Sequence, residues 1–99
     1  MNSSRYIGVD LGTSCTLVYT KDKGITVNEP SVVAFEKSSS GIIAVGSAAQ
    51  RMVGKTPFGI STMYPLRDGV IADFEFCAEM LNEFIKKEQA LFSEYDRRL

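Results

Sequence analysis

The stretch IGVDLGTSCT, residues 7–16, runs from a short apolar segment into an acid, a glycine and a cluster of small side chains. Residues 6–9 form a continuous apolar run that is typical of a buried strand. Residues 16–20 form a second run, rich in β-branched and aromatic side chains. Because Gly12 lies between the two runs, we expect a hairpin whose tip consists of small residues.

Such a tip has a chemistry of its own. Small residues leave successive backbone N–H groups accessible, and such a nest binds phosphate oxygens at close range. A carboxylate beside phosphates is repulsive unless a cation lies between them, so Asp10 would suit a role in orienting water on a Mg²⁺ ion that bridges nucleotide phosphates. The alternative is an ordinary hairpin in which Asp10 accepts hydrogen bonds from nearby N–H groups, as Asp often does in turns. The residues alone leave both interpretations open.

A second segment matches a phosphate-binding pattern. Residues 49–56, AQRMVGKT, fit a relaxed P-loop pattern in which Ala49 replaces the first glycine. A working P-loop joins a buried strand to a helix, whereas here the preceding residues look helical and Pro57 follows directly. We interpret this segment as a short surface helix that Ser47 caps and Gly54 ends, followed by an exit loop.

Composition narrows the functional classes. The chain has 99 residues, of which 44% are hydrophobic and 23% charged, as expected for one soluble globular domain. A net charge of −1 gives no general attraction to nucleic acid. The two cysteines lack CxxC spacing and the chain has no histidine, which disfavours metal clusters and fits a reducing cytosol. The first apolar run stops at Asp10, too short for a signal peptide or a membrane span.

The rest of the chain predicts strands followed by a helix. Further strands are expected over residues 25–28, 32–35, 42–45 and 60–64, with a break at Glu29-Pro30 and a turn at residues 67–69. The strongest helix signal follows, because apolar residues recur at helical spacing at Cys77, Met80, Leu81, Phe84 and Ile85. We predict a helix from about Phe74 to Lys87, capped by Asp73, whose apolar stripe packs in the core.

Leu91 and Phe92 lie beyond that stripe and are flanked by polar residues. They are interpreted either as a core contact, as a frayed helix end or as an exposed apolar tip.

Residues 7–13 together with Thr16 resemble the first phosphate motif of the actin-like ATPase superfamily. Four further segments follow in the order seen in the bacterial actin MreB and its paralogue Mbl, namely residues 28–34, 44–46, 54–57 and 65–74. The resemblance runs from about Tyr6 to Lys87. It implies an α/β fold, the N-terminal part of an actin-like (ribonuclease H-like) ATPase, with a mixed sheet, a small inserted subdomain and a return helix.

The same resemblance implies a division of the chain into three parts. Residues 1–31 would form the first strands of the large subdomain, with the phosphate-binding hairpin. Residues 32–64 would form the small inserted subdomain, and residues 65–99 would return to the large subdomain with the amphipathic helix.

The resemblance also implies a function and a site. The family is a cytoskeletal ATPase that uses ATP and Mg²⁺ and assembles membrane-associated filaments directing rod cell shape and wall synthesis. Asp10 would meet Mg²⁺ through water, while Gly12, Thr13, Ser14 and Cys15 would line the phosphates. The family usually has asparagine at the position of Cys15, so a side-chain amide contact is lost. Partners would be other copies, the inner membrane surface and the wall-synthesis machinery, with a cytoplasmic, membrane-peripheral location and no nucleic acid.

The length of the chain and its last residues add two expectations. The family's second phosphate motif, adenosine-binding residues and catalytic acid belong to sequence that would follow Leu99, so we expect a truncated form that is not an ATPase by itself. Leu91 and Phe92 stand at about the place of a membrane-dipping apolar loop in the family. The alternatives are a non-catalytic interaction fragment and part of a cell-division ATPase of the same superfamily.

Overall fold

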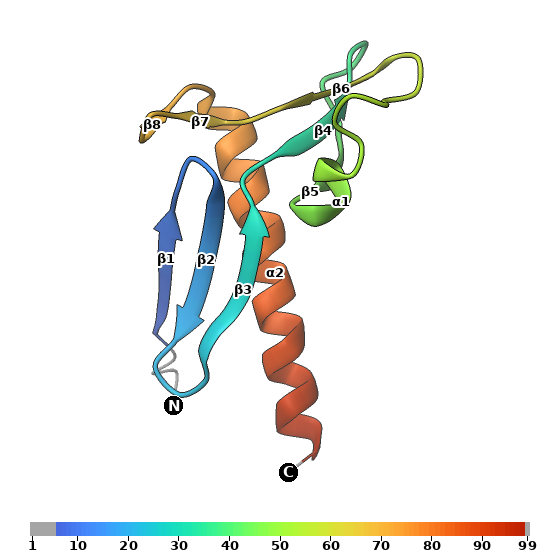
Figure 1. The fold of residues 1–99 in the computed structure, drawn as a ribbon. Helices are drawn as coiled ribbons and strands as arrows, with labels where there is room; N and C mark the ends of the chain where they lie inside the picture. The colour runs from blue at the N-terminus through green and yellow to red at the C-terminus, as the bar shows by residue number, and fades with distance from the viewer. Residues whose placement is uncertain (1–5, 99) are drawn as a thin grey trace.

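The computed structural model describes residues 6–98 and the side chains of residues 6–90, and its fold combines three small sheets with a long helix (Figure 1). The elements in chain order are β1 (Ile7–Leu11), β2 (Cys15–Thr20), β3 (Gly24–Pro30), β4 (Val33–Glu36), β5 (Ile42–Val45), α1 (Ser47–Gln50), β6 (Ile60–Met63), β7 (Leu66–Arg67), β8 (Val70–Ile71) and α2 (Phe74–Arg98). The expected α/β class and its order of strands before a long helix are confirmed.

The first sheet has the order β1-β2-β3, with both pairs antiparallel. Val9 lies opposite Val18, and Val18 lies opposite Val27, which places an apolar row across the sheet. Residues 7–20 therefore form the expected hairpin. Strand β3 runs through Pro30, so the predicted break at Glu29-Pro30 is wrong by two residues and falls at Ser31-Val32. Pro30 is tolerated there because it is the last residue of its strand.

The second sheet has the order β5-β4-β6, and a two-stranded ribbon joins β7 to β8. The ribbon turns at Asp68 and Gly69, whose φ angles are +52° and +77°. Positive φ at both central residues is the conformation that two-residue hairpin loops favour, and Asp-Gly is one of its preferred sequences. The predicted turn is confirmed at residues 68–69, while Arg67 is the last residue of β7.

The core lies where α2 packs against the first sheet and the start of β4. Cys77, Met80 and Phe84 are buried on the predicted stripe, and Leu81 and Ile85 are half-buried. The other buried side chains of this cluster are those of Val18, Val27, Val33, Leu66 and Phe76. Asp73 caps the helix as predicted, since its Oδ1 accepts a hydrogen bond from the Phe76 N–H at 2.9 Å.

Both helices differ from the sequence prediction in length or capping. Helix α2 extends to Arg98 rather than ending near Lys87, because residues 88–98 contain neither glycine nor proline and include several strong helix formers. Helix α1 is a single turn over Ser47–Gln50, and turns rather than helix continue to Gly54. Ser47 does not cap it; Gly46 is the N-cap residue, and glycine has no side chain that could accept a hydrogen bond from the helix.

The capping group of α1 comes instead from another strand. Glu29, on β3, accepts a hydrogen bond from the Ser47 N–H at 2.7 Å through its Oε1. The other carboxylate oxygen of Glu29 is paired with the Lys87 ammonium on α2. A carboxylate at a helix N-terminus is electrostatically favourable. Glu29 therefore joins the first sheet, the small helix and the long helix at one point.

No helix in the described part of the chain is both long and apolar enough to cross a membrane.

Candidate functional site

The tip of the β1–β2 hairpin is a tight turn that requires glycine at position 12. The Gly12 N–H donates to the Cys15 carbonyl at 3.1 Å, which closes the turn. A Cβ atom added at Gly12 would lie 2.7 Å from that same carbonyl oxygen, closer than real Cβ contacts come. The missing side chain thus lets the two strands of the hairpin meet directly below the tip.

Ser31 holds the tip from behind. Its side chain is fully buried, and its Oγ donates to the Gly12 carbonyl at 2.7 Å. Ser31 Oγ also lies 2.7 Å from Oγ1 of Thr16, which is fully buried as well. The Ser31 N–H in turn donates to the Ser14 carbonyl at 3.0 Å. Buried hydroxyl groups with such partners fix the conformation of the turn, since breaking the network would leave polar groups unsatisfied.

The β7–β8 turn holds the tip from the side. Oγ1 of Thr13 accepts a hydrogen bond from the Gly69 N–H at 2.9 Å. This contact joins residues 56 positions apart, so the two turns meet only in the folded chain. Figure 1 shows the upper end of the β1–β2 hairpin beneath the β7–β8 ribbon.

Two donors of the tip remain available. Within the described residues, neither the Thr13 N–H nor the Ser14 N–H donates a hydrogen bond to another part of the chain. Both residues are exposed. Since the carbonyls and hydroxyls below the tip are engaged while these N–H groups are not, the tip presents donors to solvent, as an oxygen-rich anion requires.

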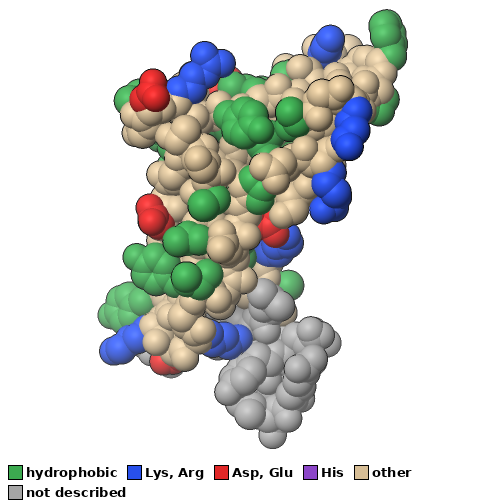
Figure 2. Space-filling view, viewed as in Figure 1, with side chains coloured by type: hydrophobic (Ala, Val, Ile, Leu, Met, Phe, Trp, Pro, Cys, Tyr) green, Lys and Arg blue, Asp and Glu red, His purple; other side chains and the backbone are tan. Residues whose placement is uncertain are grey.

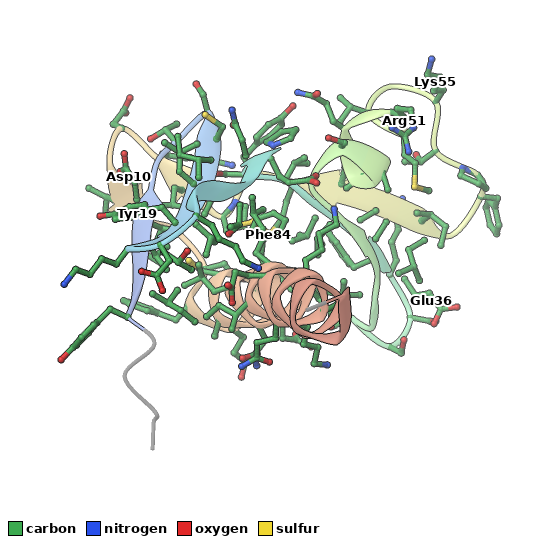
Figure 3. All side chains as sticks on the ribbon, turned by 90° about the horizontal axis from the view of Figure 1, so that it is seen from below. Asp10, Tyr19, Glu36, Arg51, Lys55 and Phe84 are labelled. Atoms are coloured by element: carbon green, nitrogen blue, oxygen red, sulfur yellow. The ribbon has the colours of Figure 1, made fainter. Side chains whose placement is uncertain are left out.

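Asp10 and Cys15 flank the tip on the two strands. Asp10 lies opposite Leu17 in the register, and both Asp10 and Cys15 are exposed. Asp10 lies on the same face of the sheet as Tyr19 (Figure 3). The Tyr19 ring covers Gly8, and a Cβ atom added at Gly8 would lie 2.3 Å from that ring. The structure therefore groups Asp10, Gly12, Thr13, Ser14 and Cys15 at one end of one hairpin. Leu91 and Phe92 lie outside the residues whose side chains are described.

A protein-only metal centre is absent from this region. In the part of the chain that the structure describes, no three Asp, Glu, Cys or His side chains gather in a way that would hold a metal ion. A cation beside Asp10 would therefore need most of its ligands from water and from a bound anion, which is how proteins commonly hold Mg²⁺ with nucleotide phosphates.

The relaxed P-loop match has a different geometry. Residues 49–56 begin inside α1 and continue in turns and a loop, and no helix begins at Lys55 or Thr56. Their backbone hydrogen bonds are local, for instance from the Met52 N–H to the Ala49 carbonyl at 2.9 Å and from the Lys55 N–H to the Met52 carbonyl at 3.0 Å. Because the strand-to-helix geometry of a P-loop is missing, the segment is not a P-loop. The predicted exit loop is confirmed, while the predicted short helix ends at Gln50 and not near Gly54.

Two supporting residues were not predicted from sequence as part of the site. Ser31 and Gly69 hold the tip, yet neither carries phosphate chemistry of its own. The sequence signals for these two residues are weak. Ser31 directly follows the proline that ends β3, and Gly69 belongs to an Asp-Gly turn in a distant ribbon.

Glu29 links the first sheet, which carries the hairpin tip, to both helices through charged contacts. Burial by itself raises the pKa of Glu29, but hydrogen bonds from Lys87 and Ser47 outweigh burial and hold the pKa below its ordinary value. Glu29 thus stays ionised at neutral pH and keeps β3 in contact with both helices.

Comparison with known proteins shows the family to which this chain belongs. The model of the MreB/Mbl protein family matches residues 4–97. The cell shape-determining protein Mbl of Bacillus subtilis is 56% identical over 84 residues, which cover 85% of this chain and 25% of Mbl. The cell shape-determining protein MreB of Escherichia coli K12 is 47% identical over 88 residues, with the same coverage of both chains.

Solved structures show the same fold. The crystal structure of MreB5 of Spiroplasma citri bound to ADP superposes with a TM-score of 0.78 at 39% identity, covering 88% of this chain and 26% of MreB5. The AMPPNP-bound structure of the same protein gives a TM-score of 0.76 at 40% identity. The chain thus spans about a quarter of the length of these relatives and has the fold of the N-terminal portion of actin-like MreB5. By its sequence and its fold, the chain belongs to the MreB/Mbl family.

Proposed function

We propose that this chain contributes the first phosphate-binding element of an ATP-dependent, actin-like filament protein that determines rod cell shape. The observation that carries the proposal is the hairpin tip. Among the described residues the Thr13 and Ser14 N–H groups donate to no other part of the chain, while Ser31 and Gly69 hold the turn in place. A turn that is fixed before the ligand arrives needs little reorganisation to bind an anion.

The residues at the tip fit nucleotide phosphates. Gly12 removes the side chain that would block close approach, and the exposed side chains of Thr13 and Ser14 are small. Cys15 contributes a thiol where the family usually has an amide, so we expect weaker phosphate contacts on that side than in other family members. The MreB5 relatives of known structure are bound to ADP and AMPPNP, which supports a nucleotide as the ligand.

Asp10 fits a Mg²⁺ ion that the phosphates would bring with them. Its carboxylate is exposed near the end of β1 next to the tip, and among the described residues it belongs to no group of three or more Asp, Glu, Cys or His side chains that could hold a metal ion. We assign it to water molecules on the ion rather than to direct ligation. When bound, Mg²⁺ would neutralise phosphate charge, and this chain's part is to hold the phosphates and orient that water shell.

The proposed division of the chain follows the sheets. We assign residues 1–31 to the opening strands of a large subdomain, residues 32–64 to a small inserted subdomain and residues 65–99 to the return into the large subdomain. Family membership supports self-association into filaments in the cytoplasm, with a membrane-peripheral location and contact with the wall-synthesis machinery as the finer parts of the proposal.

A chimera tests the proposed function. The matching first quarter of Bacillus subtilis Mbl is replaced by residues 6–90 of this chain, and polymer is measured by sedimentation with and without Mg-ATP. We expect the chimera to form polymer with Mg-ATP and to lose Mg-dependent nucleotide binding when Asp10→Ala is introduced.

The matched control is Asp22→Ala, which removes another exposed acid from the turn at the opposite end of β2. We expect this variant to bind nucleotide like the parent chimera. Equal Mg-ATP affinity of the Asp10→Ala and parent chimeras would show that Asp10 is only a turn residue.

A second candidate is a non-catalytic interaction fragment. It is favoured by exposed apolar side chains on the outer face of the first sheet, where Tyr19 and Ile25 are paired across β2 and β3 and are 45% and 59% exposed. Figure 2 shows hydrophobic side chains gathered on the lower left, over this sheet. If the chain alone lowers the polymer mass of intact Mbl without binding nucleotide, this second function applies.

Membrane contact at Leu91 and Phe92 also remains a proposal. Liposome co-sedimentation of the polymerised chimera, extended to residue 99, would be compared with its Leu91→Ser/Phe92→Ser variant. Unchanged lipid binding by the folded variant would rule out this tail as an anchor.

A further inference from the structure

Residues 29–32, called here the connector, link the first sheet to the second sheet. Figure 1 shows the chain passing through this segment from the end of β3 into β4, with the β1–β2 hairpin on one side and α1 on the other. The Val32 N–H donates to the Pro30 carbonyl at 3.0 Å, which closes a tight three-residue turn centred on Ser31. Since the proline ring also fixes its own φ angle, the connector has little freedom to bend.

One side of the connector holds the hairpin tip. Ser31 donates to the Gly12 carbonyl through its Oγ and to the Ser14 carbonyl through its N–H. Pro30 lies opposite Cys15 in the register of β2 and β3. The fully buried Ser31 is therefore the residue of the connector that fixes where the tip is held.

The other side of the connector holds α1 and the strand that precedes it. The Gly46 N–H donates to the Val32 carbonyl at 2.9 Å, and the next N–H, that of Ser47, donates to Oε1 of Glu29 at 2.7 Å. The first and the last residue of the connector thus bind two consecutive residues at the start of α1. This double contact fixes the connector against the small helix.

The surroundings of Glu29 leave it little room for another position. Gly46 is buried and has a φ angle of +65°. A Cβ atom added at Gly46 would overlap Oε1 of Glu29 and would lie 3.0 Å from a ring carbon of Phe84 on α2. The other oxygen of Glu29 is paired with Lys87, and the Glu29 side chain is 15% exposed, compared with 55% for Lys87. Because both oxygens are engaged in a close-packed region, a change at Glu29 must shift its neighbours.

We propose that Glu29 is a positioning residue for the hairpin tip and acts through Ser31, two residues further along the connector. Glu29 fixes the connector against both helices, and the connector keeps Ser31 behind the Gly12 carbonyl. Loosening Glu29 would let Ser31 move and the tip lose its fixed conformation. By reciprocity, an anion that holds the tip would also protect the Ser47 N–H. The statement about anions rests on the proposed function, whereas the statement about the conformation of the tip does not.

Hydrogen exchange of the ¹⁵N-labelled 99-residue chain, measured by NMR, tests the positioning role without any nucleotide. Glu29→Gln keeps an acceptor for the Ser47 N–H but removes the charge that attracts Lys87. We expect the Ser31 and Gly12 amides to exchange about fivefold faster than the change in urea-measured stability explains, because the tip opens locally.

A core variant separates this local effect from a general loss of stability. Phe76→Leu removes part of the ring contact between Phe35 and Phe76 and leaves the residues of the connector unchanged. We expect it to accelerate the Ser31 and Gly12 amides only as far as its lower stability requires. No excess acceleration in Glu29→Gln, or an equal excess in Phe76→Leu, would overturn the positioning role.

Variants of the lysine partner give a milder form of the same test. Lys87→Met removes the charge and keeps most of the stem, so the Ser31 amide should exchange faster, whereas Lys87→Arg keeps the charge and should stay within about twofold of the parent chain. Lys86→Met is the matched control, since Lys86 pairs with Glu83 on α2 itself and should not affect the Ser31 amide. Equal exchange of the Ser31 amide in the Lys87→Met and Lys86→Met chains would contradict the inference.

A titration with Mg-ADP separates the positioning role from the proposed function. We expect Glu29→Gln to weaken the binding reported by the Thr13 and Ser14 amides about fivefold, and Lys86→Met to leave it unchanged. If these amides of the parent chain do not respond to Mg-ADP, the proposed function fails, while the exchange result still decides the role of Glu29. Equal Mg-ADP affinities of the parent and Glu29→Gln chains would overturn the coupling between Glu29 and an anion at the tip.

Discussion

The β1–β2 hairpin tip and the segment at residues 49–56 both contain a glycine and a threonine, yet different kinds of contact hold the two segments in place. The hairpin tip receives hydrogen bonds that join it to residues 19 and 56 positions away, through Ser31 and Gly69. The segment at residues 49–56 is held by bonds between near neighbours. The proposed function places the phosphate site at the turn that tertiary contacts fix, and not at the turn that is held only by near neighbours.

The largest expected effect comes from adding one methyl group at each turn. Gly12→Ala would bring its Cβ to 2.7 Å from a backbone oxygen, so we expect a loss of stability of about 3 kcal/mol. Gly54→Ala meets nothing within 4 Å but must adopt a φ of +79°, for a loss of about 1 kcal/mol. Urea unfolding of both variants measures the difference, and equal losses would contradict the special status of the hairpin tip.

Removing the hydroxyl behind the tip is expected to have the next largest effect. Ser31→Ala leaves the buried Thr16 hydroxyl and the Gly12 carbonyl without a shared partner, so we expect a loss of about 2 kcal/mol. Ser38→Ala, in the exposed β4–β5 turn, is the control and should change stability by less than about 0.5 kcal/mol. If both variants unfold at the same urea concentration, the network behind the tip contributes nothing.

Glu29, which joins the sheet of the tip to both helices, predicts a pH dependence. Its pKa lies lower in the folded chain than in the unfolded chain, so it stabilises the fold above the ordinary value of 4.5. That contribution disappears as the pH falls through the lower folded-state value. Glu29→Gln should therefore lower stability by about 1 kcal/mol at pH 7. The expected loss is small because Lys87 is exposed and water screens its charge. The variant should also lose less stability than the parent chain as the pH falls below the ordinary pKa of Glu29.

The control for this charge is Glu83→Gln. Glu83 pairs with Lys86 at 3.4 Å on the exposed side of α2, where ion pairs contribute little. We expect its stability to match that of the parent chain within about 0.5 kcal/mol at pH 7. An unchanged acid limb in the Glu29→Gln chain would show that other carboxylates dominate the pH dependence.

The smallest effect is expected at the contact between the two turns. Thr13→Val removes the acceptor of the Gly69 N–H and should lower stability by about 0.5 kcal/mol, because the bond is exposed to water. Hydrogen exchange of the Gly69 amide should accelerate in Thr13→Val and stay slow in Thr13→Ser, which keeps the hydroxyl. Equally slow exchange in both variants would mean that the contact is not made in solution.

Sequence patterns predicted the elements better than the contacts between them. Apolar periodicity predicts the strands, and the capping residue Asp73 predicts the start of α2. Both signals come from residues that are near neighbours in the sequence. The cap of α1 could not be predicted in this way, because Glu29 and Ser47 are 18 positions apart and meet only when β3 lies beside α1. The residue type of Ser47 predicts a side-chain cap, but the capping group is a carboxylate from another strand.

The site was predictable to the same extent. Glycine and small side chains between two apolar runs indicated the hairpin tip and its accessible N–H groups. Ser31 and Gly69 could not be assigned, since the bonds they make depend on the register of β3 and on the position of the β7–β8 ribbon. A pattern of phosphate-binding residues therefore locates a candidate turn, while tertiary structure decides whether that turn is held ready.

The most direct test is an NMR titration of the ¹⁵N-labelled 99-residue chain with Mg-ADP up to millimolar concentrations. A phosphate element on its own supplies only a few hydrogen bonds, so binding should be weak, with dissociation constants on the order of millimolar. The account predicts shifts of the Thr13 and Ser14 amide signals, abolished by Asp10→Ala when Mg²⁺ is present, and no shift at residues 54–56. Shifts at residues 54–56 with none at the hairpin tip would contradict it.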